Sequence, residues 1–351
     1  MTDFYTNWPD TLKKLNIHAL GIVSAEKTKT YSIYCDIVHK GVPANLHYLI
    51  KNAACRQDFS QIMPETKSVI CVAIAIPEVP DTSICKYARF CASGDYHQVL
   101  RDKLNAVDLL LRQHYPIHQS RICVDSAPVL ERELAVRAGI GHIGFNRMVI
   151  HPQYGSWISL GELLVDVDLC SDAKLLNYQT HPGDSSDLIP GSKCNCSTGN
   201  RICIKSCPTG ALSESGYDMH RCLSYWSTQH KGEIPEEYEV LMGCVLWGCD
   251  RCQLCCPQNK SFHTVNANSP LWTLSYENIL TTSGKSLQKK FNGSPLADAH
   301  PYLVQRNACI VLGNLGDMRY ISLLDLVSRD HKCDWVRSTA KRSLMRLCDE
   351  H

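Results

Sequence analysis

The sequence predicts a chain of mixed α and β structure, of the α/β or α+β class, in three parts. Short β-branched runs alternate with amphipathic stretches over residues 1–170, which favours an α/β domain. Ten of the 20 cysteines lie within residues 194–260, which indicates a compact cofactor-binding module. Apolar residues at helical spacing predict a helical region over residues 261–351. Residues 171–193 contain a run of Pro, Gly, Ser and Asp and are expected to form a linker.

The elements of the first domain follow from local patterns. Residues 68–76 form a short β-branched run ended by Pro77, so we expect a buried strand there. A helix is expected over residues 102–113, where apolar side chains recur at helical spacing. A second short strand is expected at residues 122–125 and a second helix at residues 131–137. Strands and helices therefore alternate, as they do in α/β domains.

Composition limits the function classes. The chain has 351 residues, 44% of them apolar, which is enough for a large buried core. Its formal charge of +1 gives no global attraction to nucleic acid or membranes, so such a partner must meet a local patch. No apolar stretch approaches the roughly 18 residues of a membrane span, and the first ten residues do not resemble a leader. We expect a cytoplasmic, monomeric protein without a membrane partner.

Two cysteine runs end in Cys-Pro. Cys203 and Cys207 form a CxxxCP run, and Cys249, Cys252 and Cys256 form a CxxCxxxCP run. In two-cluster ferredoxins, the cysteine that closes each run ligates the other iron–sulfur cluster. The sequence therefore predicts a ferredoxin-like module with two 4Fe–4S clusters. Structural zinc is the alternative, but zinc favours two CxxC pairs and only one is present.

The ligand sets follow from this crossing pattern. One cluster is expected on Cys207 together with Cys222, Cys249 and Cys252. The other is expected on Cys203 and Cys256, with Cys194 and Cys196 as the remaining ligands. Cys244 and Cys255 are then spare thiols.

The C-terminal region has the pattern of a HEAT-type helical pair. Gly313, Asn314 and Gly316 are expected to stop its first helix. The apolar faces are supplied by Val304, Cys309, Leu312, Leu323 and Leu326. Because such units bury their faces only on neighbouring units, one pair is not a free solenoid. We expect it to pack as a cap on the cysteine module.

Seven segments carry a family resemblance and occur in family order over nearly the whole chain. They are DYH (95–97), VDSAPVLERELAVRAGIGHIGFN (124–146), YGSWISLGELLVD (154–166), CPTGAL (207–212), RCLSYWS (221–227), WGCDRCQLCCPQN (247–259) and RNACIVLGNLGD (306–317). Together they resemble the epoxyqueuosine reductase family. The resemblance implies reduction of epoxyqueuosine to queuosine at the wobble position of tRNA anticodons. It also implies two 4Fe–4S clusters that pass electrons to cobalamin in the first domain, and an external donor such as flavodoxin or ferredoxin.

The resemblance also implies roles for individual residues. Asp125 matches the family's general acid, which would protonate the epoxide oxygen from a dry pocket. By residue type alone, Asp125 fits the N-cap of the following helix equally well. The expected corrin contacts are Arg56, His97, Asp125, Val149, His151, Leu160 and Ser224. Phosphate contacts to tRNA require basic side chains, and the candidates are Lys231, Lys285, Lys289, Lys290 and Arg306.

This chain departs from the family pattern at Ser197 and Asn200, where the family's first cysteine run usually has cysteines. Two alternatives to the tRNA function remain open on sequence. One is a reductase of the same architecture that acts on a different small substrate. The other is an electron carrier that has clusters but no catalysis. Retention of cobalamin would exclude the electron carrier and leave the two enzyme functions.

Overall fold

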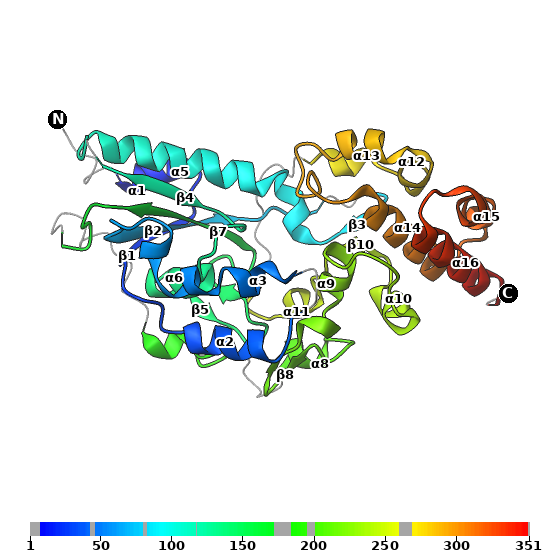
Figure 1. Cartoon of the computed structure of the whole chain (residues 1–351), viewed down its shortest axis with the longest axis horizontal. Coiled ribbons are helices and arrows are strands. Elements are labelled where there is room, and N and C mark those ends of the chain that lie inside the picture. Colours follow the sequence, from blue (N-terminus) through cyan, green and yellow to red (C-terminus); the bar gives the residue numbers. More distant parts are fainter. Residues whose placement is uncertain are drawn as a thin grey trace.

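The computed structural model describes residues 8–42, 46–79, 83–116, 118–171, 184–194, 201–259 and 269–349. The chain forms an elongated molecule, with a sheet-containing part at the N-terminal end and a helical part at the C-terminal end (Figure 1). No helix in the described ranges combines the length and the apolar character that crossing a membrane requires.

A four-stranded sheet organises the first part. Its strands are β1 (Ala19–Ser24), β2 (Ser68–Ala75), β4 (Ser120–Cys123) and β7 (Ile158–Val165), in the order β1-β2-β7-β4. Every neighbouring pair is antiparallel. The α/β class is therefore wrong for this sheet, and α+β describes it. The physical reason is that β7 inserts between β2 and β4, so these two strands, which the helix α5 (Tyr96–Arg112) links in the sequence, are not neighbours in space.

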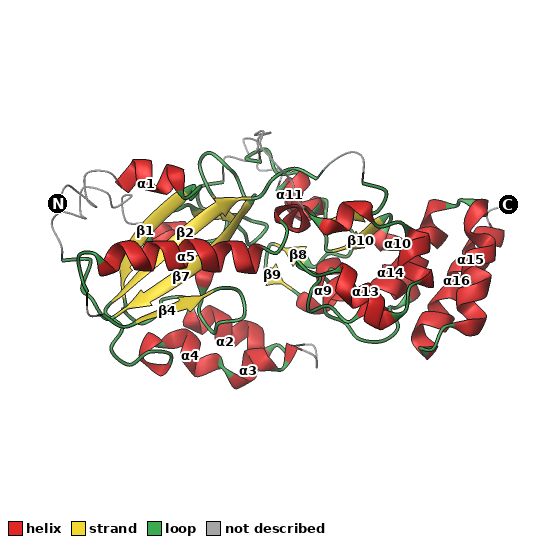
Figure 2. Cartoon of the chain, turned by 90° about the horizontal axis from the view of Figure 1, so that it is seen from above, coloured by secondary structure: helices red, strands yellow, loops and turns green. Residues whose placement is uncertain are grey.

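The two faces of the sheet bury different helices. Alternate residues of β2 point to opposite faces, and the helix α5 (Tyr96–Arg112) covers one face with Leu100 and Leu104. The helix α6 (Glu131–Arg137) covers the other face with Leu134. Figure 2 shows α5 running across the sheet. The strand expected over residues 68–76 and the helix expected over residues 131–137 are confirmed, whereas α5 begins earlier than residue 102 because Asp95 caps it.

Shorter elements complete this part. They are α1 (Trp8–Lys14), α2 (Tyr31–His39), α3 (Tyr48–Lys51), α4 (Ala53–Gln57), η2 (Phe59–Gln61), η3 (Arg89–Ser93), β5 (His142–Ile143), β6 (Val149–Ile150) and η4 (Ser185–Leu188). The strand β3 (Lys86–Tyr87) lies outside the four-stranded sheet. It pairs in parallel with β10 (Val245–Trp247) of the cysteine module.

The second half contains the cysteine module and the C-terminal helices. The module comprises α8 (Ile202–Lys205), β8 (Leu212–Ser213), β9 (Gly216–Tyr217), η5 (Met219–Arg221), α9 (Leu223–Thr228), α10 (Glu236–Met242), β10 and α11 (Arg251–Leu254). The C-terminal elements are η6 (Pro270–Thr273), α12 (Tyr276–Thr281), α13 (Gly284–Lys290), α14 (Pro301–Leu315), η7 (Met318–Tyr320), α15 (Ile321–Asp330) and α16 (Asp334–Asp349).

The helix α14 joins the C-terminal helices to the module. It packs on α9, α10 and β10 on one side and on α16 on the other. The Asn307 side chain donates hydrogen bonds to the carbonyl oxygens of Ser227 and Leu246, at 2.8 and 2.9 Å. The helix ends at Gly316, which adopts a left-handed conformation. Gly313 and Asn314, in contrast, lie inside the helix and do not stop it.

The apolar residues expected on these helices divide into buried and exposed members. Val304, Cys309 and Leu312 are fully buried. Leu323 packs against the same core, whereas Leu326 is 45% exposed. Gly313 permits a close approach between α14 and α16, because a Cβ atom there would lie 2.8 Å from the Cβ of Ser343.

Candidate functional site

Asp125 lies in the loop between β4 and α6 and has an unusual backbone. Its φ is +52°, in the left-handed region that non-glycine residues rarely adopt. Its backbone N–H donates a hydrogen bond of 2.7 Å to Oε1 of Glu131. The N-cap position of α6 is Leu130, which makes no side-chain cap hydrogen bond. The N-cap interpretation of Asp125 is therefore wrong, and its side chain is available for another role.

The carboxylate of Asp125 lies beside His97. The Oδ2 atom of Asp125 is 3.3 Å from Nε2 of His97, and the Nδ1 atom of the same ring is 2.9 Å from Oδ1 of Asp95. The Tyr96 ring stacks on His97 at a centroid distance of 4.0 Å. Hydrogen bonding to Asp125 raises the pKa of His97, burial opposes this, and Asp95 adds to the rise. The structure thus brings two predicted site residues together.

Two glutamates that sequence reasoning missed lie behind this pair. Burial, followed by the charge of Asp125, raises the pKa of Glu131 to about 7. Glu162 on β7 is fully buried, and neither carboxylate oxygen has a hydrogen-bond partner. Burial, and then the charge of Glu131, raise the pKa of Glu162 well above its usual value. One signal was present in the sequence, since Glu162 is the single acid within the apolar run ISLGELLV.

Arg56 and Tyr48 approach this site from the N-terminal helices. The Arg56 guanidinium is buried, lies 5.3 Å from the centroid of the Tyr34 ring and donates to the Asn52 carbonyl. Burial, followed by the charge of Asp125, raises the pKa of Tyr48, while Arg56 lowers it. Tyr48 is therefore within electrostatic range of both Asp125 and Arg56. Tyr48 is a second residue that sequence reasoning missed.

The remaining expected corrin contacts lie on β6, β7 and α9 and just after β6. Val149 on β6 is 3% exposed, and Leu160 on β7 is partly buried against the same apolar cluster. His151 follows β6, and burial lowers its pKa to about 4. Its Nδ1 accepts hydrogen bonds from the backbone N–H groups of Gln153 and Tyr154. Ser224 lies on α9, where its carbonyl accepts hydrogen bonds from side chains of the same helix.

The cysteines of the second run lie together with those of the first. Burial raises the pKa of Cys252, and the charges of Cys249, Cys222, Cys203 and Cys207 raise it further, which places these thiols near one another. The helices α8 and α11, which carry Cys203 and Cys252, also pack together. Cys194 and Cys256 are described, whereas Cys196 lies outside the described residues. Within the described ranges, no three His, Cys, Asp or Glu side chains are placed to share a single metal ion.

Several hydrogen-bond donors surround the Cys207 thiol. Burial opposes its ionisation, but the backbone N–H groups of Leu212, Thr209 and Ala211 and the Thr209 hydroxyl together lower its pKa. Hydrogen bonds to cysteine sulfur are typical of iron–sulfur ligation.

The cysteine module lies within electrostatic range of α6. The Tyr217 side chain on β9 is hydrogen-bonded to Cys222 and lies within electrostatic range of Arg132. Arg132 directly follows Glu131 in the sequence. The start of α6, beside Asp125, is therefore within electrostatic range of the Tyr217–Cys222 pair of the cysteine module.

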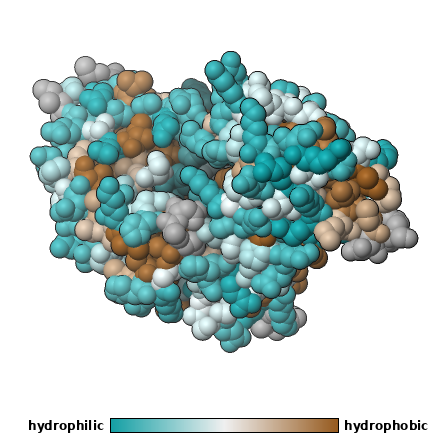
Figure 3. Space-filling view, turned by 45° about the vertical axis from the view of Figure 1, so that its right-hand side comes forward, coloured by the Kyte–Doolittle hydropathy of each residue, from teal (hydrophilic) through white to brown (hydrophobic). Residues whose placement is uncertain are grey.

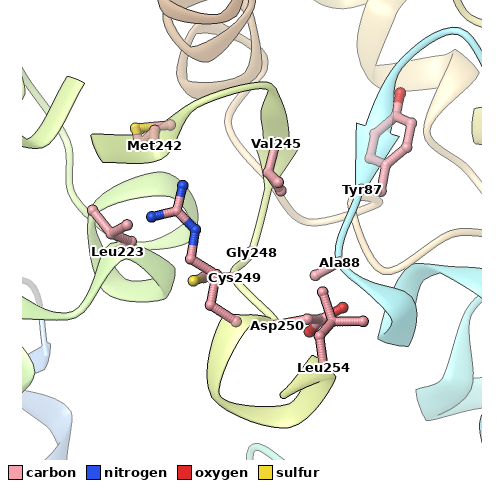
Figure 4. Close-up of a pocket in the computed structure, with 10 residues that line it drawn as sticks. Tyr87, Ala88, Leu223, Met242, Val245, Gly248, Cys249, Asp250 and Leu254 are labelled. Atoms are coloured by element: carbon pink, nitrogen blue, oxygen red, sulfur yellow. The ribbon is translucent and has the colours of Figure 1, made fainter. Parts of the chain in front are cut away.

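Polar contacts fix the cysteine loop to the sheet part. The Ser156 N–H donates to Oδ1 of Asn259 at 2.6 Å, and the Arg89 N–H donates to Oδ2 of Asp250 at 2.5 Å. A cavity of about 80 Å³ lies beside this loop. Figure 4 shows Cys249 and Asp250 on the loop, with Tyr87 and Ala88 on one side of the cavity and Leu223 and Met242 on the other.

The expected tRNA contacts divide into two groups. Lys231, Lys285, Lys289 and Lys290 are exposed, and Lys285 and Lys289 line a surface cavity of about 480 Å³. Arg306 is fully buried, and its guanidinium donates 2.8 Å hydrogen bonds to the carbonyls of Trp226, His230 and Gly232. The expected phosphate contact of Arg306 is therefore wrong, because its donors are already used inside the protein.

Comparisons with known proteins agree with this architecture. Residues 56–126 match the family described as epoxyqueuosine reductase QueG, DUF1730, and residues 195–259 match the 4Fe-4S double cluster binding domain. The epoxyqueuosine reductase of Streptococcus thermophilus has a solved structure with a TM-score of 0.83 and 24% identity, covering 99% of this chain and 91% of that one. Another epoxyqueuosine reductase, solved with an epoxyqueuosine-modified tRNA-Tyr stem loop, gives a TM-score of 0.78 at 24% identity, with 97% and 89% coverage.

The cluster-domain match supports iron–sulfur clusters and not zinc in the cysteine module. Among curated relatives, the epoxyqueuosine reductase of Listeria monocytogenes is 31% identical over 301 residues. This alignment covers 82% of this chain and 74% of the relative. Sequence identity over this length, together with the acid–histidine pair and the adjoining cysteine module, shows that the chain belongs to the epoxyqueuosine reductase family.

Proposed function

We propose that this protein reduces epoxyqueuosine to queuosine in tRNA, with Asp125 as the proton donor. The observation that carries the proposal is the position of Asp125. It lies beside His97, and Arg132 on the adjoining helix α6 is within electrostatic range of Tyr217, which is hydrogen-bonded to Cys222. An acid for the leaving oxygen and a site for electron-transfer cofactors are thereby adjacent. The solved relative with an epoxyqueuosine-modified stem loop supports the choice of substrate.

Two 4Fe–4S clusters fit the cysteine module. Cys207, Cys222, Cys249 and Cys252 would hold one cluster, and the thiols named here interact electrostatically. Cys194, Cys196, Cys203 and Cys256 would hold the other. When bound, the clusters supply single electrons. The N–H donors around Cys207 favour its thiolate, which is the form that ligates iron.

Cobalamin fits the surface around Asp125. Tyr48 is 50% exposed and Ile50 is 42% exposed on α3, and Tyr48 is within electrostatic range of Asp125. Large exposed apolar side chains beside a candidate acid are typical of a ligand-binding face. Brown, hydrophobic areas break the teal surface of the left-hand lobe in Figure 3. The residues that would hold the macrocycle are Arg56, His97, Asp125, Val149, His151, Leu160 and Ser224.

The residues of this chain would then provide the protons. Removal of the epoxide oxygen as water consumes two electrons and two protons and leaves a carbon–carbon double bond. The Asp125 carboxyl gives a proton to the oxygen as the carbon–oxygen bond breaks. His97, whose pKa is raised by Asp125, holds a proton at Nε2 next to that carboxyl. The Asp125 side chain is 59% exposed in the protein alone, so bound cofactor and substrate would exclude water from it.

The tRNA would bind near α13. Lys285, Lys289 and Lys290 are exposed there, and Lys231 is exposed in the cysteine module. With a net charge of +1, only such a local group can supply phosphate contacts. We also propose an external donor such as flavodoxin or ferredoxin, a monomeric state and a cytoplasmic location.

The deciding experiment uses anaerobically reconstituted protein, a chemical reductant and tRNA that contains epoxyqueuosine. Nucleoside analysis should show queuosine with the native protein and little with the Asp125→Asn variant. Absence of queuosine in the presence of bound clusters and cobalamin would instead favour a reductase for another small substrate. If the protein does not retain cobalamin, the electron carrier is the candidate function that remains.

A further inference from the structure

The backbone of Asp125 is held in a conformation that needs support. A non-glycine residue in the left-handed region is strained and persists only where its surroundings fix it. Within the loop, the Ser126 N–H donates to the Val124 carbonyl at 2.6 Å, which tightens the turn but does not contact Asp125.

The contact that does reach Asp125 comes from Glu131. Oε1 of Glu131 accepts the Asp125 N–H at 2.7 Å, across six residues of sequence. Glu131 is the first residue of α6, and the next turns of this helix are anchored by the fully buried residues Leu134 and Ala135. The acceptor therefore stands on a rigid element, whereas the donor lies in a loop. A hydrogen bond to a carboxylate is also stronger than one to a neutral acceptor.

The groups around Glu131 explain why its carboxyl turns toward the loop. Asp125 and His97 lie on one side, Arg132 follows it on α6, and Glu162 lies within electrostatic range on β7. Glu162 offers Glu131 no hydrogen bond, since neither of its oxygens has a partner. The Asp125 N–H is thus the hydrogen-bond partner that the structure gives to Glu131 at the site.

We propose that Glu131 is a positioning residue, which holds the Asp125 backbone N–H and thereby keeps the Asp125 carboxylate next to His97. The catalytic consequence rests on the proposed function. The geometric claim does not, because it concerns the free protein. Glu131 orients the acid and does not itself transfer a proton to substrate.

The test compares a variant that keeps the acceptor oxygen at position 131 with one that lacks it. Glu131→Gln keeps an acceptor oxygen at the same distance from α6, whereas Glu131→Ala removes it. Glu133→Gln is the matched control, because Glu133 is also a buried acid of α6 but accepts hydrogen bonds from Lys29 and Thr30, away from Asp125. Thermal melting identifies any variant that is merely unfolded. If Glu131→Ala does not fold, Glu131→Met, which keeps the length of the side chain without an acceptor oxygen, takes its place and is compared with Glu133→Gln.

The first readout is the titration of His97 by NMR in protein that contains its clusters, with the signal assigned through His97→Gln. The pKa of His97 should lie above the usual value of 6.5 in native protein, fall in Glu131→Ala toward its value in Asp125→Asn, and fall less in Glu131→Gln. An unchanged His97 titration in folded Glu131→Ala would overturn the proposal. An equal fall in Glu131→Gln and Glu131→Ala would do the same.

The second readout is kinetic. Loss of the hydrogen bond should lower kcat by about 10- to 100-fold in Glu131→Ala with little change in KM for tRNA, while Glu131→Gln retains most of the rate. If native protein makes no queuosine, the proposed function fails, but the His97 titration still decides the role of Glu131.

Discussion

Nε2 of His97 lies 3.3 Å from Oδ2 of Asp125, although 28 residues separate them in the sequence. The N-terminus of α5 supplies the histidine, and the loop after β4 supplies the acid. The loop after β4 and the start of α5 therefore lie at the same end of the sheet. This pair is the centre of the candidate functional site.

Replacing the acid tests its role directly. Asp125→Asn keeps the size of the side chain but cannot donate a carboxyl proton, so we expect kcat to fall by about 100-fold or more. Binding of tRNA and iron content should not change, because Asp125 contacts neither a cysteine nor a lysine named here. Single-turnover assays with matched binding measurements check this. A variant with native kcat would assign the proton donor elsewhere.

Replacing cysteines tests the ligand sets. Cys222→Ser should remove about half of the protein-bound iron and sulfide, because each cubane is held by four thiolates. Cys255→Ser is the control, since its thiol contacts the Cys252 carbonyl at 3.6 Å and is not needed as a ligand. Iron and sulfide analysis of anaerobic protein gives the comparison, and equal losses in both variants would contradict the assignment.

Buried Glu162 should make stability depend on pH. Its pKa is raised in the folded protein, so the folded state keeps a proton that the unfolded state releases above its usual pKa of 4.5. The free energy of unfolding should then decrease as pH rises from about 4.5, by up to about 1.4 kcal/mol per pH unit from this group alone. Glu162→Gln should flatten the pH dependence of the melting temperature. Parallel curves for the two proteins would argue against a neutral buried carboxyl.

Two exposed lysines should contribute to tRNA affinity. Lys285→Ala and Lys289→Ala are each expected to weaken binding and to reduce the slope of log affinity against log salt by about 1. Their melting temperatures should stay native because both side chains are exposed. Lys67→Ala, an exposed lysine beside β2, is the control. Salt titrations of binding that show no difference from this control would remove α13 from the interface.

Arg306 should behave in the opposite way. Arg306→Ala would leave three part-buried carbonyl groups without their donor, so we expect a loss of about 3 kcal/mol in unfolding free energy. At a temperature where the variant is folded, its salt slope for tRNA should be native. A reduced salt slope with native stability would restore the phosphate contact that its burial excludes.

The local parts of this fold were predictable, and the long-range parts were not. The strand β2 and the helix α6 follow from apolar runs and spacing within ten residues. The antiparallel order depends on β7, which lies over 80 residues after β2 in the sequence. In the sheet, β7 lies between β2 and β4, the two strands that the sequence predicts. Nothing in the spacing of residues 68–137 encodes that insertion.

The site shows the same division. The cysteine runs were found because their motifs are short and specific, whereas Asp125 was singled out only by the family resemblance of the segment around it. The contact between Asp125 and Glu131 was not found, because a glutamate at the start of a helix is usually a solvated charge. Arg306 was wrongly predicted to contact phosphate, because its burial depends on hydrogen bonds to carbonyl groups 74 to 80 residues away in the sequence.

The pairing of β3 with β10 has a consequence for synthesis of the protein. Residues 86–87 leave the ribosome long before residues 245–247, so the segment between β2 and α5 must wait for its partner strand. The first half of the chain therefore cannot complete its own fold during translation. A fragment that ends after β7 would expose Cys85, Tyr87 and Cys91, which the intact chain buries among the C-terminal helices, and such a fragment is expected to aggregate.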